Sequence, residues 1–262
     1  MIDLGLEGRP ALVTGAAVGI GRATARLLAQ AGCDVALADR DRVGLDAAVE
    51  EVRGEGTSVL ALPTDLREPG APARMVGDVV AAWGGVQVAV NNVGSLAGLT
   101  PRPLVDQDDA YVQEVVAQNL LVTAACARAE ATVMRDGGGG VILNVSSGES
   151  TRPALGLGAY GAAKAAINHL TQTLAAELGP AGVRVNAVAP GTTLTPTVRA
   201  ALSDEYVDAL VGSIPLRRMN EPEDLARLVV ALASELGRGV TGQLVLADNG
   251  AHLSRHRPAL EV

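Results

Sequence analysis

Short runs of apolar residues alternate along almost the whole chain with longer segments whose apolar residues recur every three to four positions. Several of the runs are nearly continuous valine, leucine, isoleucine and alanine. A strand of that composition is apolar on both faces and needs cover on both. We therefore predict strands at residues 11–13, 34–38, 58–62, 86–91, 141–145, 184–189 and 243–246.

The segments between these strands have the periodicity of amphipathic helices. We predict helices at residues 21–31, 42–54, 71–83, 106–135, 159–178 and 223–235. Strand followed by helix, repeated, builds a parallel sheet that is wound on both sides. The predicted fold class is α/β: a single Rossmann-like domain over residues 1–262, a doubly wound parallel sheet of about seven strands with helices on both faces.

Residues 192–219 interrupt this rhythm, because the segment is long and contains two prolines. We expect a substrate loop inserted there, with a short helical stretch at 198–211 that closes over the substrate.

Composition and charge exclude several classes of partner. Apolar residues make up 48% of the chain and the net charge is −8, with no Phe, one Trp and three Tyr. So few aromatic rings exclude stacking on nucleic-acid bases, and the negative charge disfavours nucleic acids and anionic membranes. The chain has no uninterrupted apolar run of 18 residues, and its first residues lack the pattern of a signal peptide. We expect a soluble, cytoplasmic protein.

The cysteines and histidines do not predict a metal site. Cys33 and Cys126 have neither metal-ligand nor disulfide spacing, and we expect both to be small apolar residues on helices. The three histidines are scattered, and His169 is expected to be a packing residue. The histidines are His169, His252 and His256.

A glycine-rich turn follows the first strand and immediately precedes a helix. It holds Gly15, Gly19 and Gly21 in the spacing G-x-x-x-G-x-G. Glycines in such a turn allow a pyrophosphate to approach backbone N–H groups and the positive end of the helix dipole. Close packing also produces glycine-rich turns, but the position after the first strand of an alternating fold favours a dinucleotide site.

Asp39 ends the second predicted strand, 18 residues after Gly21. A carboxylate there can accept hydrogen bonds from the adenosine ribose and would repel a 2′-phosphate. This predicts NAD as cofactor, with NADP disfavoured. Arg40 follows directly and could weaken that preference, and a surface aspartate at the end of a strand is also common.

Several motifs occur in an order that resembles the classical short-chain dehydrogenases/reductases, over residues 8 to 250. They are Thr14 to Gly21 for T-G-x-x-x-G-x-G, Asp65-Leu66, Asn91-Asn92-Val93-Gly94 for N-N-A-G, Asn119, Asn144-Val145-Ser146-Ser147, Tyr160 to Lys164 for Y-x-x-x-K, and Pro190-Gly191 with Thr193 and Thr195. Residues 241–250 also resemble the family's last strand and its turn. Two departures are Val93 in place of Ala in the N-N-A-G motif and Asn249 in place of Gly in that last turn.

The resemblance implies the site. The implied catalytic residues are Asn119, Ser147, Tyr160 and Lys164. The implied cofactor-binding residues are Gly15, Val18, Gly19, Ile20, Gly21, Asp39, Arg40, Asp65, Leu66, Asn92, Gly94, Tyr160, Lys164, Pro190, Gly191, Thr193 and Thr195. Ser147 is preferred over Ser146 because the family's serine lies 13 residues before the tyrosine. Relatives form tetramers through helices equivalent to 106–135 and 159–178, so we expect a homotetramer.

Tyr160 and Lys164 are four residues apart on a predicted helix and therefore share one face. To lower the pKa of a tyrosine from about 10 by about 3, roughly 4 kcal/mol must favour the phenolate. One ammonium about 4 Å away at an effective dielectric of about 20 supplies that amount. The spacing therefore predicts a tyrosine whose pKa is lowered by the lysine and that exchanges a proton with the substrate oxygen.

Three functions remain open from the sequence. The first is an NAD(H)-dependent oxidoreductase that interconverts a secondary alcohol and a ketone on a small molecule by direct hydride transfer. The second is a reductase of 3-oxoacyl groups on an acyl carrier protein, which the net charge and Asp39 disfavour. The third is a non-catalytic dinucleotide-binding regulator, which has no need of all four catalytic residues. The substrate is not identified, and Glu149 either enters its pocket or faces solvent.

Overall fold

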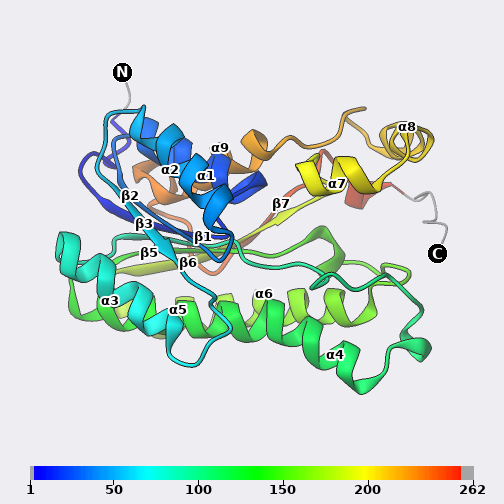
Figure 1. Ribbon diagram of the computed structural model, residues 1–262, viewed down its shortest axis with the longest axis horizontal. Coiled ribbons are helices and arrows are strands. Elements are labelled where there is room, and N and C mark those ends of the chain that lie inside the picture. Colours follow the sequence, from blue (N-terminus) through cyan, green and yellow to red (C-terminus); the bar gives the residue numbers. More distant parts are fainter. Residues whose placement is uncertain (1–2, 255–262) are drawn as a thin grey trace.

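A seven-stranded parallel sheet forms the centre of the computed structural model, which describes residues 3–254 (Figure 1). Its strands are β1 (Pro10–Thr14), β2 (Asp34–Asp39), β3 (Val59–Pro63), β4 (Val88–Asn91), β5 (Gly140–Val145), β6 (Val183–Pro190) and β7 (Leu244–Ala247). They lie in the order β3-β2-β1-β4-β5-β6-β7, and each neighbouring pair is parallel. This confirms the predicted α/β fold. The chain order reverses between β1 and β4, which is where such sheets bind ligands.

Helices cover both faces of the sheet (Figure 1). One layer contains α1 (Gly19–Gln30), α2 (Arg42–Arg53) and α9 (Pro222–Ala233), and the other contains α3 (Ala71–Trp83), α4 (Asp109–Val116), α5 (Val122–Asp136) and α6 (Gly158–Leu178). Each layer closes its own apolar core, and β1 contributes Val13 to one and Leu12 to the other. Because successive residues of a strand point to opposite faces, the continuous apolar runs are explained by cover on both sides.

Three smaller expectations were wrong in detail. The first helix begins at Gly19 rather than Gly21, so the glycine turn and the helix overlap. The fourth strand begins at Val88, two residues later than expected. Cys33 is buried as expected but lies in the turn before β2, not on a helix, whereas Cys126 is on α5.

The helix expected at residues 106–135 is not a regular α-helix. A short 3₁₀ turn (Leu104–Asp106) ends where the helix was expected to begin, and α4 starts only at Asp109. A π-helical turn (Ala117–Leu121) separates α4 from α5. At that turn the Val122 N–H donates to the Ala117 carbonyl, five residues back. π-Turns inside α-helices often coincide with functional sites, and this one contains Asn119.

The segment at 192–219 also differs from the expected single helical stretch. It forms two helices, α7 (Pro196–Ala201) and α8 (Asp204–Ser213), beside the carboxyl ends of the strands (Figure 1). The break follows from capping: the Ser203 side chain accepts a hydrogen bond from the Tyr206 N–H and starts a new helix.

A buried carboxyl group lies in the helix layer below the strand ends. Glu130 on α5 is completely buried, and its Oε2 accepts a 2.9 Å hydrogen bond from Asn91 Nδ2. Asn91 Nδ2 also donates to Asn144 Oδ1, and Asn144 Nδ2 donates to Thr171 Oγ1. Within residues 3–254, Glu130 Oε1 and Asn91 Oδ1 are buried without a hydrogen-bond partner. Burial raises the pKa of Glu130 to about 7, because desolvation outweighs the Asn91 hydrogen bond.

We expect Glu130→Gln to stabilise the protein in alkaline solution and to change little in acid. In the unfolded chain the carboxyl loses its proton near pH 4.5, whereas in the folded protein it keeps the proton to about pH 7. Wild-type stability therefore falls as pH rises through that window, by roughly 3 kcal/mol at most. Urea unfolding of both proteins at about pH 5 and about pH 9 measures this. Glu177→Gln, at an exposed position, is the control. The prediction would be contradicted if Glu130→Gln changed the free energy of unfolding by the same amount at both pH values.

Candidate active site

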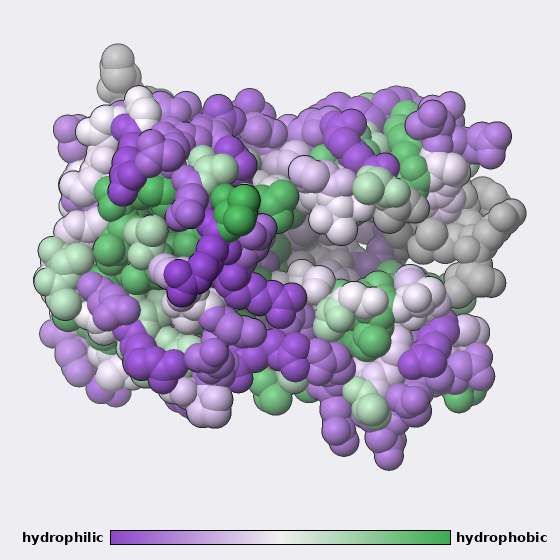
Figure 2. Space-filling model, viewed as in Figure 1, coloured by the Kyte–Doolittle hydropathy of each residue, from purple (hydrophilic) through white to green (hydrophobic). Residues whose placement is uncertain are grey.

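A cavity of about 610 Å³ opens where β1 to β4 end at their carboxyl edge. Figure 2 shows a hollow on this face, between the part that carries α7 and α8 and the part that carries α4 and α6. The predicted cofactor residues that line the cavity are Gly15, Val18, Gly19, Ile20, Asp39, Arg40, Asp65, Leu66, Asn92, Gly94 and Thr195. Residues from four different strand ends therefore meet at one site.

The glycine turn forms one wall. Gly15 and Gly19 have φ of +65° and +60°, a region that favours glycine. Gly21 is buried rather than in the cavity, and a Cβ on it would lie 2.0 Å from the Gly15 carbonyl oxygen. Helix α1 begins at Gly19 with no side-chain cap and no acidic residue in its first turn. Its first N–H groups are thus available for an anion in the cavity.

Asp39 lies at the end of β2 and is held by the backbone. Its Oδ2 accepts from the Ala17 N–H at 3.1 Å and its Oδ1 from the Asp41 N–H at 3.0 Å. Arg40 faces Asp65, with Nη1 4.0 Å from Asp65 Oδ2. The carboxylate therefore has a fixed position at this end of the cavity, and the neighbouring guanidinium lies beside a second carboxylate.

The segment after β4 connects the cavity to the predicted catalytic residues. Asn92 Nδ2 donates to the Gly15 carbonyl at 3.1 Å, which joins this segment to the glycine turn. A Cβ on Gly94 would lie 2.6 Å from Lys164 Nζ and 2.7 Å from Asn119 Oδ1. Glycine at position 94 is therefore required by close approach, and Lys164 and Asn119 lie directly behind the cavity wall.

Asn119 occupies the π-turn and is fully buried. Its Nδ2 donates to the Val115 carbonyl at 2.8 Å and to the Ser95 carbonyl at 2.7 Å. Asn119 Oδ1 is buried and has no hydrogen-bond partner in the described part of the chain. An unpartnered acceptor of this kind is suited to a water or ligand in the site.

Ser147 and Tyr160 face each other across the end of β5 and the start of α6. The Glu149 N–H donates to Ser147 Oγ at 3.2 Å, and Ser147 hydrogen-bonds the Tyr160 side chain. Ser146 points elsewhere: its hydroxyl donates to Asn168 Oδ1 at 2.6 Å. Of the two candidate serines, the one beside the tyrosine is Ser147.

The expected lowering of the tyrosine pKa by Lys164 was wrong for this structure. Burial raises the pKa of Tyr160 above its usual value of 10, the Ser147 hydrogen bond opposes this, and the Glu149 charge adds to it. Lys164 Nζ lies 5.7 Å from the centre of the Tyr160 ring and donates to the Val145 carbonyl at 2.9 Å. Burial also lowers the pKa of Lys164 to about 8. The phenol is therefore in the protonated state that reduction of a ketone requires.

The predicted cofactor residues after β6 do not all lie in the cavity wall. The Gly191 N–H donates to the Ala247 carbonyl, and the Thr193 hydroxyl donates to the Gly191 carbonyl at 3.0 Å. Pro190 is next to the serine loop, since a Cβ on Gly148 would lie 3.3 Å from the Pro190 carbonyl oxygen. Of this group only Thr195 lines the cavity.

Some cavity residues were not predicted. They are Thr64, Arg67, Ser95, Gly98, Gln118, Val122, Thr197 and Val198, whereas Val93 was expected beside the cofactor as part of the motif at residues 91–94. Thr64 and Arg67 flank the Asp65-Leu66 pair and could have been found from it. Arg67 makes a bidentate ion pair with Glu114 on α4, at 2.6 and 2.8 Å. No sequence signal links these two residues, which are 47 positions apart.

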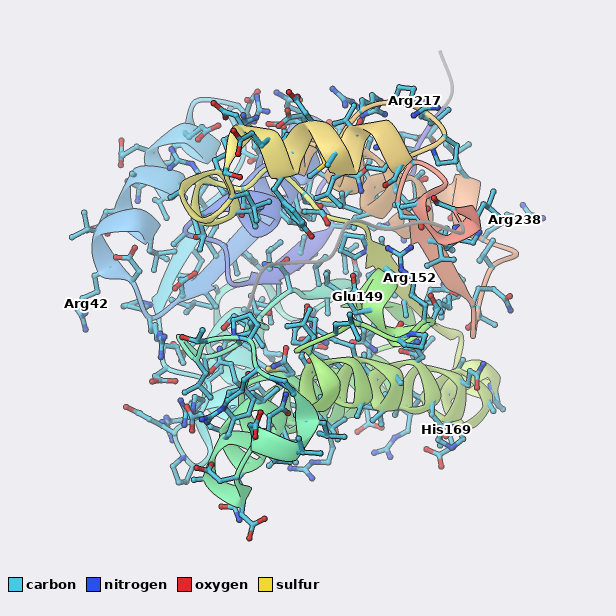
Figure 3. The ribbon with its side chains drawn as sticks, turned by 90° about the vertical axis from the view of Figure 1, so that its right-hand side faces the viewer. Arg42, Glu149, Arg152, His169, Arg217 and Arg238 are labelled. Carbon is cyan, nitrogen blue, oxygen red and sulfur yellow. The ribbon has the colours of Figure 1, made fainter. Side chains whose placement is uncertain are left out.

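Charged residues around the site differ in orientation (Figure 3). Glu149 and Arg152 lie between α6 and the α7–α8 segment, so Glu149 is on the site side. His169 is exposed on the outer face of α6, so the expectation that it packs within the chain was wrong. His252 forms an ion pair with the buried Asp248, and His256 lies outside the described residues.

In residues 3–254 no group of three or more His, Cys, Asp or Glu could hold a metal ion. No helix in the same residues is long and apolar enough to span a bilayer.

The residues present fit a dinucleotide. The uncapped start of α1 suits a pyrophosphate, Asp39 suits a ribose, and the Gly94 cradle with the Asn119 acceptor suits the reactive end. Gly19 at the start of α1, Asp39 and Gly94 all line one cavity, and Asn119 lies against Gly94.

Comparison with known proteins agrees with this geometry. A family model described as enoyl-(acyl carrier protein) reductase matches residues 15–252. The chain is 37% identical to the short chain dehydrogenase/reductase astE of Aspergillus oryzae, over 95% of this chain and 96% of that protein. It is also 37% identical to cyclohexanol dehydrogenase of Rhodococcus sp. (strain TK6), over 95% of this chain and 97% of that protein.

A solved structure of 7 alpha-hydroxysteroid dehydrogenase, complexed with NADH and 7-oxo glycochenodeoxycholic acid, has a TM-score of 0.90 and 29% identity. The match covers 95% of this chain and 96% of that one. With the sheet order, the glycine turn and the Tyr160–Lys164 pair, these similarities show that the chain belongs to the short-chain dehydrogenase/reductase family, whose members are oxidoreductases of CH–OH groups that use a nicotinamide dinucleotide.

Proposed function

We propose that this protein is an NAD(H)-dependent oxidoreductase that interconverts an aliphatic or alicyclic secondary alcohol and its ketone. The observation that carries the proposal is the Ser147–Tyr160 pair, whose tyrosine lies near Lys164. Lys164 and Asn119 in turn lie against Gly94, which lines the cavity. Tyr160 and Leu99 both pack against the buried apolar cluster of Tyr111, Val115 and Ala159, so one side of the site is apolar. Cyclohexanol and hydroxysteroids, named for two similar proteins, are substrates of this kind.

When bound, the nicotinamide dinucleotide supplies the hydride to a ketone carbon or accepts it from an alcohol carbon. Ser147 donates a hydrogen bond to the substrate oxygen and fixes its position. Tyr160 gives its proton to that oxygen during reduction and takes it back during oxidation. Lys164 would hold the nicotinamide ribose, and Asn119 would hold a water through its unpartnered Oδ1. The hydride brings two electrons and the tyrosine brings the proton, so the reduction balances.

Two cations that could bind a 2′-phosphate are already beside carboxylates. Arg40 faces Asp65, and Arg67 is held by Glu114. Val18, at the glycine turn, carries no charge. This arrangement supports NAD over NADP and leaves Asp39 as the residue that meets the adenosine ribose.

The description of the matching family model favours a second candidate, an acyl group on a carrier protein as substrate. Such a carrier is acidic, and the net charge of −8 opposes its binding. A substrate panel distinguishes the two. We expect NAD⁺ reduction with cyclic and linear secondary alcohols, and little NADH oxidation with a 3-oxoacyl or enoyl thioester. The reverse pattern would reject the proposal in favour of the carrier-protein substrate, and turnover of neither class with intact dinucleotide binding would favour the non-catalytic regulator.

We expect the protein to assemble as a homotetramer through the outer faces of α5 and α6. On α6, Ala162 and Ala176 are exposed, so another helix could approach closely there, whereas Ala163 and Ala175 face the core. Leu121 at the start of α5 is 58% exposed and would be covered. Light scattering at micromolar concentration should give four times the mass of one chain. A monomeric mass would contradict this expectation. A cytoplasmic location also stays a prediction.

A further inference from the structure

The loop that carries Ser147 is tied to α6 by a chain of side-chain hydrogen bonds. Before Ser147, the Ser146 hydroxyl donates to Asn168 Oδ1 at 2.6 Å and lies 3.2 Å from the Lys164 carbonyl. After it, Asn168 Nδ2 donates to Ser150 Oγ at 2.9 Å, and the Ser150 hydroxyl donates to the Ser147 carbonyl at 2.6 Å. A single amide therefore contacts the residues on both sides of Ser147.

The same helix carries the other half of the site. Tyr160, Lys164 and Asn168 follow one another at intervals of four on α6, which places them in successive turns of one face. Tyr160 contacts Ser147, Lys164 contacts the Val145 carbonyl, and Asn168 contacts Ser146 and Ser150. The serine loop is thus bound to the tyrosine's helix at both ends.

Resting on the proposed function, we propose that Asn168 is a positioning residue that sets the separation between the Ser147 and Tyr160 hydroxyls. It touches neither substrate nor cofactor, and it acts through Ser146 and Ser150. A substrate oxygen must accept from Ser147 and exchange a proton with Tyr160 at the same time. A misplacement of about 1 Å in such a site can lower the rate by about a hundredfold.

Asn168→Ala removes both connections. We expect kcat for ketone reduction to fall by about ten- to a hundredfold. The dissociation constant of NADH, measured by calorimetry, should stay within about twofold, because the serine loop faces substrate. Gln113→Ala removes an amide from an exposed position on α4, outside the proposed tetramer faces, and should leave kcat unchanged.

Two further variants test separately the hydrogen bond between Asn168 and Ser146 and the hydrogen bond between Asn168 and Ser150. Asn168→Asp keeps an acceptor for Ser146 but no longer donates to Ser150, so its kcat should lie between wild type and Asn168→Ala. Ser150→Ala removes the acceptor of the Asn168–Ser150 hydrogen bond and leaves Asn168 in place. If both residues act through one path, the double variant Asn168→Ala/Ser150→Ala should be no slower than Asn168→Ala alone.

Hydrogen–deuterium exchange tests the connection without turnover. In Asn168→Ala we expect faster exchange of the backbone N–H groups of residues 149–150, and no change there in Gln113→Ala. Unchanged exchange, or a kcat within twofold of wild type, would overturn the proposal, as would rate losses that multiply in the double variant. If Asn168→Ala lost NADH affinity by the same factor as kcat, Asn168 would have a general structural role, and this result would also overturn the proposal. Absence of wild-type turnover with every alcohol and ketone would instead reject the proposed function, and exchange would still test the connection.

Discussion

Replacement of Tyr160 by phenylalanine is expected to lower kcat by about three orders of magnitude, within the range of 10²–10⁴ that general acid–base catalysis contributes. The substitution removes the proton donor and leaves the ring, which packs against the buried cluster that contains Val115 and Ala159. The fold and NADH affinity should therefore change little. The measurements are steady-state turnover, NADH binding by calorimetry and urea unfolding.

Tyr111→Phe is the matched control. Tyr111 is buried, and its hydroxyl donates to the Thr100 carbonyl at 3.2 Å, away from Ser147. Loss of that bond should cost some stability but leave turnover near wild type. Turnover of Tyr160→Phe within tenfold of wild type would reject Tyr160 as the acid, and a comparable loss in Tyr111→Phe would show that packing is the cause.

The pH dependence follows from the same groups. Reduction of the ketone needs Tyr160 protonated, and burial keeps its pKa above 10. The rate of reduction should accordingly hold through neutral and mildly alkaline pH and fall only as the solution approaches or exceeds that pKa. A decline near pH 8 would point to the Lys164 ammonium instead, whose pKa burial lowers to about 8.

The sheet could be predicted from the sequence because each strand is marked by its own local composition. Residues 88–90 and 141–143 are continuous apolar runs, so the identity of these strands does not depend on distant contacts. Parallel strands bring their carboxyl ends to one edge, which is why Gly15, Asp39 and Asn92 could be expected at one cavity.

The π-turn at Asn119 could not be predicted in this way. It forms where the Asn119 side chain bonds the carbonyl of Val115 on the same helix and that of Ser95 in another segment. Helical periodicity describes only the first of these contacts. The long-range partner is known only once the chain after β4 lies against α4.

The ionisation of Tyr160 was mispredicted for a related reason. The spacing of Tyr160 and Lys164 in the sequence indicates how close the two side chains can come. It does not indicate how far each side chain is desolvated in the folded protein. Lys164 is fully buried and Tyr160 is partly buried, and desolvation opposes the charged form of each. Sequence spacing therefore predicted the neighbours correctly and the direction of the pKa shift incorrectly.

The position of Asp39 makes cofactor preference the second large expected effect. Both carboxylate oxygens accept from backbone N–H groups, of Ala17 and of Asp41, so the group cannot easily turn away. Each oxygen keeps a lone pair for a ribose hydroxyl, and charge-assisted hydrogen bonds contribute roughly 1.5–3 kcal/mol. A 2′-phosphate would meet the same fixed negative charge, which can cost several kcal/mol at a partly desolvated site.

Since each 1.36 kcal/mol is about tenfold in rate, we expect kcat/KM to favour NADH over NADPH by at least about a hundredfold. Asp39→Ala should raise kcat/KM with NADPH and lower it with NADH, because the repulsion and the ribose hydrogen bonds disappear together. Arg40→Ala is the informative companion variant. The Arg40–Asp65 ion pair is long, at 4.0 Å, and the arginine side chain is largely exposed. Its guanidinium could therefore turn from Asp65 onto a phosphate. If it does so, Arg40→Ala lowers the activity with NADPH and leaves that with NADH unchanged. Equal efficiency of the wild type with both cofactors, or no gain with NADPH in Asp39→Ala, would show that Asp39 does not determine the preference.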